Sequence, residues 1–307
     1  MRTAVISHPH CRKHTMGEEH PECPERLDAI TDRLLASGVD ATIAHMQAPK
    51  VSMDQVALVH EQSLIDKVRA AIPKQGVHEF AEDVWLCPES FKAIERAAGA
   101  GILAVDEILA GNLDAAFCSV RPPGHHANQH TSSGFCVFNN VAIAVAYAKS
   151  LGVKRIAVLD IDVHHGNGTQ DILRAQSDVL FCSLFQHPFY PNSEIENNQH
   201  IVNSPLPVAS KGEDLKALFN QQWLPKLMAF KAELIFISAG FDAHIEDDMA
   251  GLQFVEADYQ WLTEQVINVA QSTQAKGIIS FLEGGYALSA LGRSVATHIK
   301  ALVEGQL

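Results

Sequence analysis

Short apolar runs alternate along this chain with longer stretches in which hydrophobic residues recur every three or four positions. The runs have the length and composition of buried strands, and they cover residues 3–7, 115–120, 156–161, 179–184, 234–238 and 278–282. The longer stretches have the periodicity of helices, and they cover about 89–109, 139–150, 214–230, 258–272 and 290–303. Because the two kinds alternate, we predict an α/β fold with a mainly parallel sheet covered by helices on both faces.

The first quarter of the chain is less regular. Pro24 lies in the first turn of a predicted helix that ends at Gly38, and residues 73–82 are expected to form an exposed loop. The loop at 8–23 contains a C-x2-H and an H-x2-C pattern, formed by Cys11, His14, His20 and Cys23. Because this loop runs straight into a helix and has no small scaffold of its own, an ordinary loop is favoured over a structural zinc site.

The composition limits the class of protein and its partners. With 47% hydrophobic and 19% charged residues the chain can bury a full core, and no linker, repeat or low-complexity tract divides it, so we expect residues 1–307 to form one domain. The net charge of −13 argues against a nucleic-acid partner and favours cationic substrates weakly. Six cysteines without a C-x-x-C pair, no signal peptide and no membrane-length apolar run predict a cytoplasmic protein with reduced thiols and no membrane partner.

The strongest chemical signal follows the run at 156–161. Asp160, Asp162 and His164 stand at alternate positions, which in an extended chain places them on one side. Carboxylate oxygens and an imidazole nitrogen suit zinc, and the best third ligand is Asp242, although an aspartate after glycine is often a helix N-cap. Asp160 is expected to orient an imidazole from behind the metal. His165 points the opposite way and is expected to be a core histidine bonded to backbone.

Two further strand ends carry residues suited to acid–base chemistry. His125 and His126 follow two prolines and a glycine, and one of them can take a proton from an attacking water and return it to a leaving amine. Tyr286 follows two glycines and offers a phenolic donor for an oxyanion, although such a tyrosine is more often a packed turn residue. In a parallel sheet these strand ends meet at one edge. Together the metal-type residues, the histidine pair and the tyrosine predict metal-assisted hydrolysis of an amide. No G-x-S-x-G, P-loop or dinucleotide motif is present, which disfavours a covalent acyl-enzyme and a nucleotide cofactor.

Six sequence blocks resemble the signature motifs of the zinc-dependent histone deacetylase family, in family order. They are residues 20–27 (HPECPERL), 121–127 (RPPGHHA), 134–140 (GFCVFNN), 160–169 (DIDVHHGNGT), 238–243 (SAGFDA) and 282–286 (LEGGY). The asparagine of HHGNG and the tyrosine-ended LEGGY resemble the class II and bacterial amidohydrolase branch more than class I. The resemblance implies the arginase/deacetylase fold, a three-layer sandwich with a mainly parallel eight-stranded sheet between helices.

The resemblance also implies a role for each matching residue. The zinc ligands would be Asp162, His164 and Asp242. The catalytic residues would be His126 as base and acid with Asn167 behind it, His125 as its electrostatic partner held by Asp160, and Tyr286, which polarises the scissile carbonyl. The substrate would contact Asp83 at the rim, Gly134 and Phe135 on one wall and Tyr190 on the other. A potassium ion would bind mainly backbone oxygens of Asp160, Asp162, His164, Ser183 and Leu184.

The expected reaction is removal of acetyl or other short acyl groups from lysine side chains, with an acyl-lysine protein or peptide as substrate. Acetylpolyamines or other small acylated amines are the alternative, a non-catalytic acyl-lysine reader is a remote one, and a manganese ureohydrolase would need a second metal cluster. The chain departs from the family at Phe185, at 191–194 and at Met249, where the polyamine branch often places an acid near the pocket mouth. These departures affect the expected substrate and leave the chemistry unchanged. The oligomeric state is left open.

Overall fold

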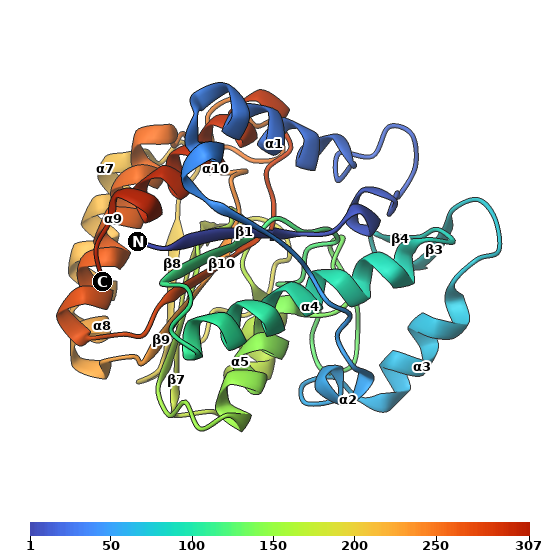
Figure 1. Ribbon diagram of the computed structural model, residues 1–307, viewed down its shortest axis with the longest axis horizontal. Helices are drawn as coiled ribbons and strands as arrows, with labels where there is room; N and C mark the ends of the chain where they lie inside the picture. The colour runs from blue at the N-terminus through green and yellow to red at the C-terminus, as the bar shows by residue number, and fades with distance from the viewer.

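An eight-stranded sheet runs through the centre of the computed structural model, which describes residues 1–307 (Figure 1). Every neighbouring pair of strands in it is parallel, in the order β2-β1-β5-β10-β9-β6-β7-β8. The strands are β1 (Thr3–Ser7), β2 (Ala44–Gln47), β5 (Ala115–Cys118), β6 (Ile156–Asp160), β7 (Val179–Gln186), β8 (Ile201–Leu206), β9 (Leu234–Ala239) and β10 (Ile278–Leu282). The predicted fold class is confirmed.

Helices cover both faces of this sheet, as the alternating pattern predicts (Figure 1). One layer packs around α10 and consists of α1 (Glu25–Ser37), α7 (Gly212–Leu218), α8 (Leu224–Phe230), α9 (Glu256–Thr273) and α10 (Leu288–Glu304). The other layer consists of α4 (Ser90–Leu109), α5 (Asn140–Ser150) and α6 (Asn167–Leu173). The short helices α2 (Met53–Val56) and α3 (Gln62–Ala71) lie beyond α4.

The central strands are buried on both faces, and this explains why their sequences are mostly apolar. Every residue of β5, β6, β9 and β10 is buried, as is typical of parallel strands covered by helices on each side. One cluster of 87 buried hydrophobic residues extends from Ala4 to Leu302. Each large aliphatic or aromatic side chain in it contributes roughly 1.5–3 kcal/mol on burial, so the core fixes the sheet that carries the functional residues.

Two predictions about elements were wrong or incomplete. Residues 73–82 are not a plain loop, since β3 (His78–Ala81) pairs with β4 (Val84–Leu86) in a separate antiparallel ribbon. The ribbon was missed because no residue of β3 is buried, so its sequence has no apolar alternation. The stretch at 214–230 is not one helix, because a π-helical turn at Phe219–Trp223 separates α7 from α8. Pro225 in the first turn of α8 lacks the N–H that a continuous α-helix would need there.

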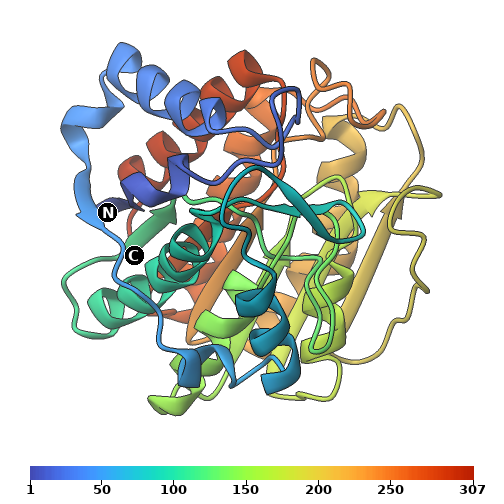
Figure 2. The same ribbon diagram turned by 90° about the vertical axis from the view of Figure 1, so that its right-hand side faces the viewer.

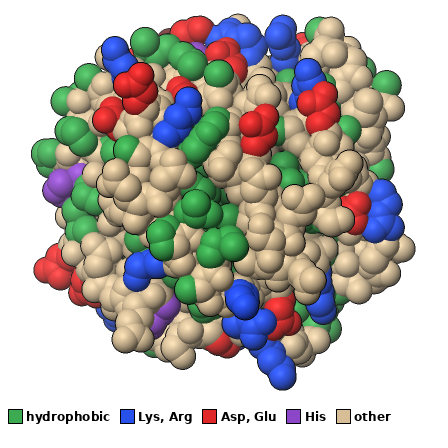
Figure 3. Space-filling view, turned by 90° about the vertical axis from the view of Figure 1, so that its left-hand side faces the viewer, with side chains coloured by type: hydrophobic (Ala, Val, Ile, Leu, Met, Phe, Trp, Pro, Cys, Tyr) green, Lys and Arg blue, Asp and Glu red, His purple; other side chains and the backbone are tan.

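The side of the molecule at the carboxyl ends of the strands differs from the side at their amino ends. Figure 2 faces the carboxyl ends of the strands, where the β3–β4 ribbon and the loops after the central strands gather. Figure 3 shows the opposite side, where hydrophobic side chains gather near the middle and charges of both signs are interspersed around them. A mixed surface of this kind lacks the continuous basic patch that phosphate binding needs. No helix combines the length and apolar character that crossing a bilayer would require.

His60, in the turn before α3, is buried in a setting that requires its neutral form. Its Nδ1 lies 2.8 Å from the carbonyl oxygen of Asn128, and its Nε2 accepts the backbone N–H of Asn139 at 2.9 Å. A protonated imidazole has no acceptor nitrogen, so protonation breaks the second bond. Burial accordingly lowers the pKa of His60 to about 4.

We expect the free energy of unfolding to fall as the pH decreases from about 6.5, the ordinary histidine pKa in an unfolded chain, toward 4. Between these two pH values, His60 is protonated in the unfolded chain and stays neutral in the folded protein. The His60→Gln variant should reduce the slope of stability against pH by up to about 1.4 kcal/mol per pH unit. Urea denaturation at several pH values measures this slope. The exposed His78 supplies the control His78→Gln, and equal slopes for the two variants would contradict the assignment.

Candidate active site

Five adjacent strands, β5, β10, β9, β6 and β7, end beside one cavity at the carboxyl edge of the sheet. Their order explains why residues far apart in sequence meet there, since sites in open parallel sheets lie outside the carboxyl ends of the strands. The cavity has a volume of about 170 Å³, and the loops after the strands, which supply its lining, lie on the side that Figure 2 presents. Its lining residues are Asp83, Pro123, His125, His126, Gly134, Phe135, His164, Phe189, Tyr190, Met249, Gly284 and Tyr286.

Asp162, His164 and Asp242 form a buried cluster whose ligand atoms all lie within 4.8 Å of one another. The Nδ1 atom of His164 is 3.0 Å from Oδ1 of Asp162 and 3.2 Å from Oδ2 of Asp242. Backbone donors fix both carboxylates: the N–H of Val163 donates to Asp242 Oδ1 at 3.0 Å, and that of Gly284 donates to Asp162 Oδ2 at 2.8 Å. The three predicted ligands are therefore together and held in place.

This cluster fits a divalent cation. Oδ2 of Asp242 is buried and has no hydrogen-bond partner, since Nδ1 of His164, 3.2 Å away, is hydrogen-bonded to Asp162. Burial and the neighbouring charge of Asp162 raise the pKa of Asp242 to about 7, as expected when two carboxylates are crowded in a low dielectric. A side chain at Gly284 would overlap the Asp242 carboxylate, so glycine is required beside the cluster. Two carboxylates and one imidazole are a donor set that zinc accepts.

The geometric argument that placed Asp162 and His164 together was wrong in one respect. Strand β6 ends at Asp160, so the alternation of an extended strand does not reach the two ligands. Instead, Oδ1 of Asp162 accepts the backbone N–H of His164 at 2.9 Å, and Oδ1 of Asp160 accepts that of Asp162 at 3.2 Å. Asp242 is likewise not an N-cap, because its Oδ1 accepts the N–H of Val163 rather than one from its own segment.

The adjacent histidines His125 and His126 each have a separate polar partner. Nδ1 of His125 is 3.0 Å from Asp160 Oδ2, and Nδ1 of His126 is 2.8 Å from Asn167 Oδ1. Burial alone would lower the pKa of His125, but the carboxylates of Asp160 and Asp162 raise it to about 10. Burial and the charge of His125 hold the pKa of His126 well below its usual value. The pair therefore consists of an imidazolium beside a neutral imidazole whose Nε2 is free to accept a proton.

Tyr286 lines the cavity with its phenol protonated. Burial, followed by the nearby charge of Asp242, raises the pKa of Tyr286 well above its usual value. The guanidinium of Arg26 lies 5.0 Å from the centroid of the ring, and it donates to the carbonyl oxygens of Gly285 and Glu283 at 2.7 and 2.5 Å. Arg26 thus holds the tyrosine ring and the backbone before it, while the hydroxyl remains a hydrogen-bond donor.

The four residues predicted to bind substrate, Asp83, Gly134, Phe135 and Tyr190, all line the cavity. Phe135 has a left-handed backbone (φ 66°), and its N–H donates to the carbonyl oxygen of Asp83 at 2.8 Å, which ties the rim to the wall. A side chain at Gly134 would overlap the His126 ring, so this position needs glycine. The cavity walls close to the two histidines are therefore aromatic and rigid.

Sequence reasoning missed Phe189 as a wall residue. Its ring stacks on His164 with centroids 5.5 Å apart, whereas Tyr190 meets His126 edge to face at 5.2 Å. Both aromatics line the cavity. The signal available in the sequence was the aromatic pair Phe189-Tyr190 in a short segment after β7.

His165 is buried as predicted, but its partners are side chains and not backbone. Nδ1 lies 2.6 Å from Ser193 Oγ, and Nε2 lies 3.1 Å from Gln170 Oε1 and 3.1 Å from Asn203 Oδ1. Ser193 belongs to the segment at 191–194, where the chain departs from the family pattern that it resembles. The bond to Ser193 therefore attaches the segment after the aromatic wall to the interior.

The structure also describes the residues of the predicted potassium site and of the loop at 8–23, where the sequence disfavours zinc. Ser183 and Leu184 lie in β7 beside Asp160, and Oγ of Ser183 is buried without a hydrogen-bond partner. In the loop at 8–23, Nδ1 of His14 is 2.8 Å from Ser90 Oγ, and the His20 ring lies against Phe135. The polar residues of that loop are thus directed at separate neighbours.

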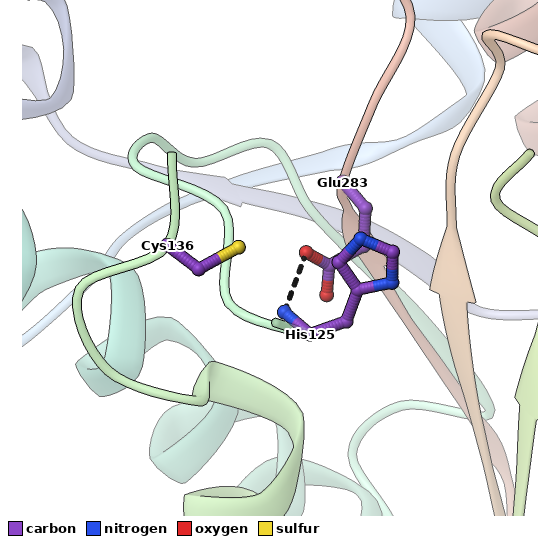
Figure 4. A group of neighbouring side chains, drawn as sticks. All are labelled: His125, Cys136 and Glu283. Carbon is purple, nitrogen blue, oxygen red and sulfur yellow. Dashed lines mark hydrogen bonds between the residues drawn. The ribbon is translucent and has the colours of Figure 1, made fainter. Parts of the chain in front are cut away.

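Glu283 is a buried carboxylate that sequence reasoning did not single out. With His125 and Cys136 it forms a second group of potential ligand atoms within 4.8 Å (Figure 4). However, its Oε2 accepts the backbone N–H groups of Gly124 at 2.7 Å and His125 at 3.1 Å, and its Oε1 accepts the hydroxyl of Ser238 at 3.3 Å. Burial raises its pKa to about 7. Its contacts therefore anchor the histidine turn to β10.

Comparison with known proteins identifies the family. The family model described as histone deacetylase domain matches residues 20–302. The type-2 histone deacetylase 2 of Dictyostelium discoideum is 33% identical over 354 residues, which cover 99% of this chain and 21% of that protein. The polyamine deacetylase HDAC10 of Homo sapiens is 33% identical over 326 residues, covering 99% of this chain and 48% of that protein.

A solved structure agrees with these relatives. The crystal structure of the HDA15 HD domain matches with a TM-score of 0.92 and 31% identity, covering 99% of this chain and 88% of that one. The parallel eight-stranded sheet between two helical layers is accordingly the arginase/deacetylase fold. The chain belongs to the histone deacetylase family.

Proposed function

We propose that this protein is a zinc-dependent deacylase that removes acetyl or other short acyl groups from lysine side chains. The family model and the named deacetylases among the relatives support hydrolytic deacetylation. The observation that carries the proposal is the meeting of a metal-type ligand cluster, a neutral histidine and a protonated tyrosine at one cavity. Each group has the protonation state that amide hydrolysis needs.

Asp162, His164 and Asp242 are the residues that would hold the metal. Bound there, Zn²⁺ supplies Lewis acidity, which polarises the acyl carbonyl and lowers the pKa of a water molecule. The carbonyl oxygen of the amide gains negative charge as water attacks its carbon. Tyr286 donates its O–H to that oxygen, and a fixed donor in a dry cavity is worth more than one in water.

His126 moves the proton. Because its Nδ1–H donates to Asn167, its Nε2 takes a proton from the attacking water as the new C–O bond forms. The same proton passes to the amide nitrogen as the C–N bond breaks, which releases the carboxylic acid and the free amine. His125, held as an imidazolium by Asp160, favours the neutral state of His126 before each cycle.

The aromatic walls suit a lysine side chain. Phe135, Phe189 and Tyr190 provide apolar surface for its methylene groups, and Asp83 at the rim offers a carboxylate to the N–H groups of a peptide substrate.

We also propose that a potassium ion binds beside the metal cluster, at backbone oxygens of Asp160, Asp162, His164, Ser183 and Leu184. The unpartnered Oγ of Ser183 supports a cation beside β7.

The proposal is tested with purified, zinc-loaded protein and peptides that carry acetyl-lysine or longer acyl-lysines. We expect stoichiometric release of acid and free lysine amine, abolished by a chelator and restored by zinc. The proposal fails if acyl-lysine amides stay intact and the wild-type and Tyr286→Phe proteins behave alike.

A second candidate keeps the chemistry and changes the substrate to acetylated polyamines or other small acylated amines. The similarity to a polyamine deacetylase and the net charge of −13 favour it. Against it stands Met249, a half-buried apolar residue on the cavity wall, where a cationic amine would gain from an acid. The ratio of kcat/KM for an acetyl-lysine peptide and an N-acetylated diamine separates the candidates.

The Met249→Glu variant should raise kcat/KM for an N-acetylated diamine relative to an acetyl-lysine peptide by about five- to tenfold. The introduced carboxylate attracts the free ammonium of the diamine, and a partly buried ion pair is worth about 1 kcal/mol or more. Met228, exposed on α8 away from the cavity, gives the control Met228→Glu. An unchanged ratio, or the same change in the control, would contradict the role of Met249.

A further inference from the structure

Asp247 has a buried carboxylate whose partners are all backbone donors. Only 5% of the residue is exposed, and it forms no ion pair. Oδ2 accepts the N–H groups of Tyr286 at 2.6 Å and Ala287 at 3.0 Å, and Oδ1 accepts the N–H of Met249 at 3.1 Å. Three N–H donors compensate one buried negative charge, and two of them belong to residues that line the cavity.

The backbone immediately before Tyr286 explains why the bond to Asp247 matters for the position of this tyrosine. Gly284 is tied to the metal-type cluster, since its N–H donates to Asp162 at 2.8 Å. Gly285 follows in a left-handed conformation (φ 119°) and provides no side chain to fix the next residue. The peptide that joins Gly285 to Tyr286 is held on both sides, since its carbonyl oxygen accepts from Arg26 at 2.7 Å and its N–H donates to Asp247 at 2.6 Å.

The loop that carries Asp247 is itself fixed. The backbone N–H of Ile245 donates to Phe254 at 2.9 Å, and Glu246 pairs with Arg293 of α10 at 2.5 Å. The loop that begins at Asp242 therefore holds the carboxylate of Asp247 in a fixed position as a hydrogen-bond acceptor. Its two oxygens connect the tyrosine on one side of the cavity with Met249 on another.

We propose that Asp247 is a positioning residue that sets the place of the Tyr286 hydroxyl through the tyrosine's backbone N–H. The inference rests on the deacylation proposed above. Asp247 touches no reacting atom, so its effect on the reaction passes through Tyr286. A displacement of a catalytic group by about 1 Å can lower the rate by roughly 10²-fold.

Kinetics of Asp247→Ala on an acetyl-lysine peptide give the first test. We expect kcat to fall about 10- to 100-fold while KM changes less than about threefold, because the lost restraint acts on transition-state stabilisation. Asp247→Asn keeps one acceptor oxygen and should lie between this variant and the wild type. Asp248, the exposed neighbour, gives the matched control Asp248→Asn, which should leave kcat unchanged.

A double-mutant cycle separates positioning from general damage to the fold. In a Tyr286→Phe background, where no hydroxyl remains to be placed, Asp247→Ala should lower kcat by less than about threefold further. If the two losses multiply, Asp247 acts independently of Tyr286 and the inference is overturned. An unchanged kcat in the single variant overturns it as well.

A spectroscopic readout tests the same inference without turnover. The chain has four tyrosines, so 3-fluorotyrosine labelling gives four ¹⁹F resonances, and Tyr286→Phe identifies the one of interest. Asp247→Asn should shift or broaden that resonance, whereas Asp248→Asn should not. A resonance identical to that of the wild type overturns the inference. If the wild type hydrolyses no acyl amide, the proposed function fails, and this measurement still decides the role of Asp247.

Discussion

Replacing Tyr286 by phenylalanine is expected to lower kcat on an acetyl-lysine peptide by about 10²- to 10³-fold, the usual cost of removing one oxyanion donor. KM should change little, because the hydroxyl gains importance only as the carbonyl oxygen becomes negative. The pKa of Tyr286 is raised well above its usual value by burial, so the hydroxyl is a donor throughout the working pH range. Steady-state kinetics of the zinc-loaded variant measure both constants.

The variant should keep its fold and its metal. The ring remains, so the contact with the Arg26 guanidinium at 5.0 Å persists, and Tyr286 supplies no ligand to the Asp162 cluster. Tyr147, whose hydroxyl donates to Asp106 on the surface at 2.8 Å, offers the matched control Tyr147→Phe. Equal kcat values for Tyr286→Phe and the wild type would remove the tyrosine from the mechanism, as would a loss explained by missing zinc.

The interior of the sheet was predictable from the sequence, and its edges were not. Strands β5, β6, β9 and β10 are buried on both faces, so each is a mostly apolar run that leads into a loop. The edge strand β2 is mostly exposed, and the other edge strand, β8, contains Asn203 and Pro205, so neither shows such a run. Because the candidate site is built on the interior strands, its residues could be named before its geometry was known.

Residues that act through distant backbone groups left no sequence pattern. Glu283 accepts the N–H of Gly124, 159 positions away, and Asp247 accepts that of Tyr286, 39 positions away. Nothing local distinguishes either carboxylate from a surface acid, since the burial that defines their roles comes from the tertiary fold. The motif at 282–286 includes Glu283, but only the structure gives it a partner.

His165 shows a related limit of reasoning from periodicity. Its burial followed from its position after an apolar strand, but its partners depend on the path of the chain beyond Asp160, where the strand ends. The segment that contains Ser193 returns to meet it at 2.6 Å. A local rule can predict that a histidine is buried, whereas its hydrogen bonds depend on segments that the rule does not include.

Removing one of the proposed metal ligands should have the other large effect. We expect Asp242→Asn to lose zinc during purification and to lower kcat/KM on an acetyl-lysine peptide by more than about 10³-fold, because activation of water and polarisation of the carbonyl are lost together. Zinc should stabilise the wild type by about 2.7 kcal/mol at a hundred times its Kd and should not stabilise the variant. Thermal unfolding with zinc or a chelator, together with metal analysis, measures these changes.

The same substitution should have the opposite effect on stability when a chelator is present. Burial and the charge of Asp162 raise the pKa of Asp242 to about 7, so without metal the folded state loses stability as the pH rises from the ordinary carboxyl range through 7. Asparagine resembles the protonated acid and removes that loss, so at pH 8 in chelator Asp242→Asn should melt at a higher temperature than the wild type. The exposed Asp248→Asn should melt like the wild type in either condition. A wild type that is more stable than Asp242→Asn in chelator would show that the two carboxylates do not repel each other, and the proposed cation site rests on that repulsion.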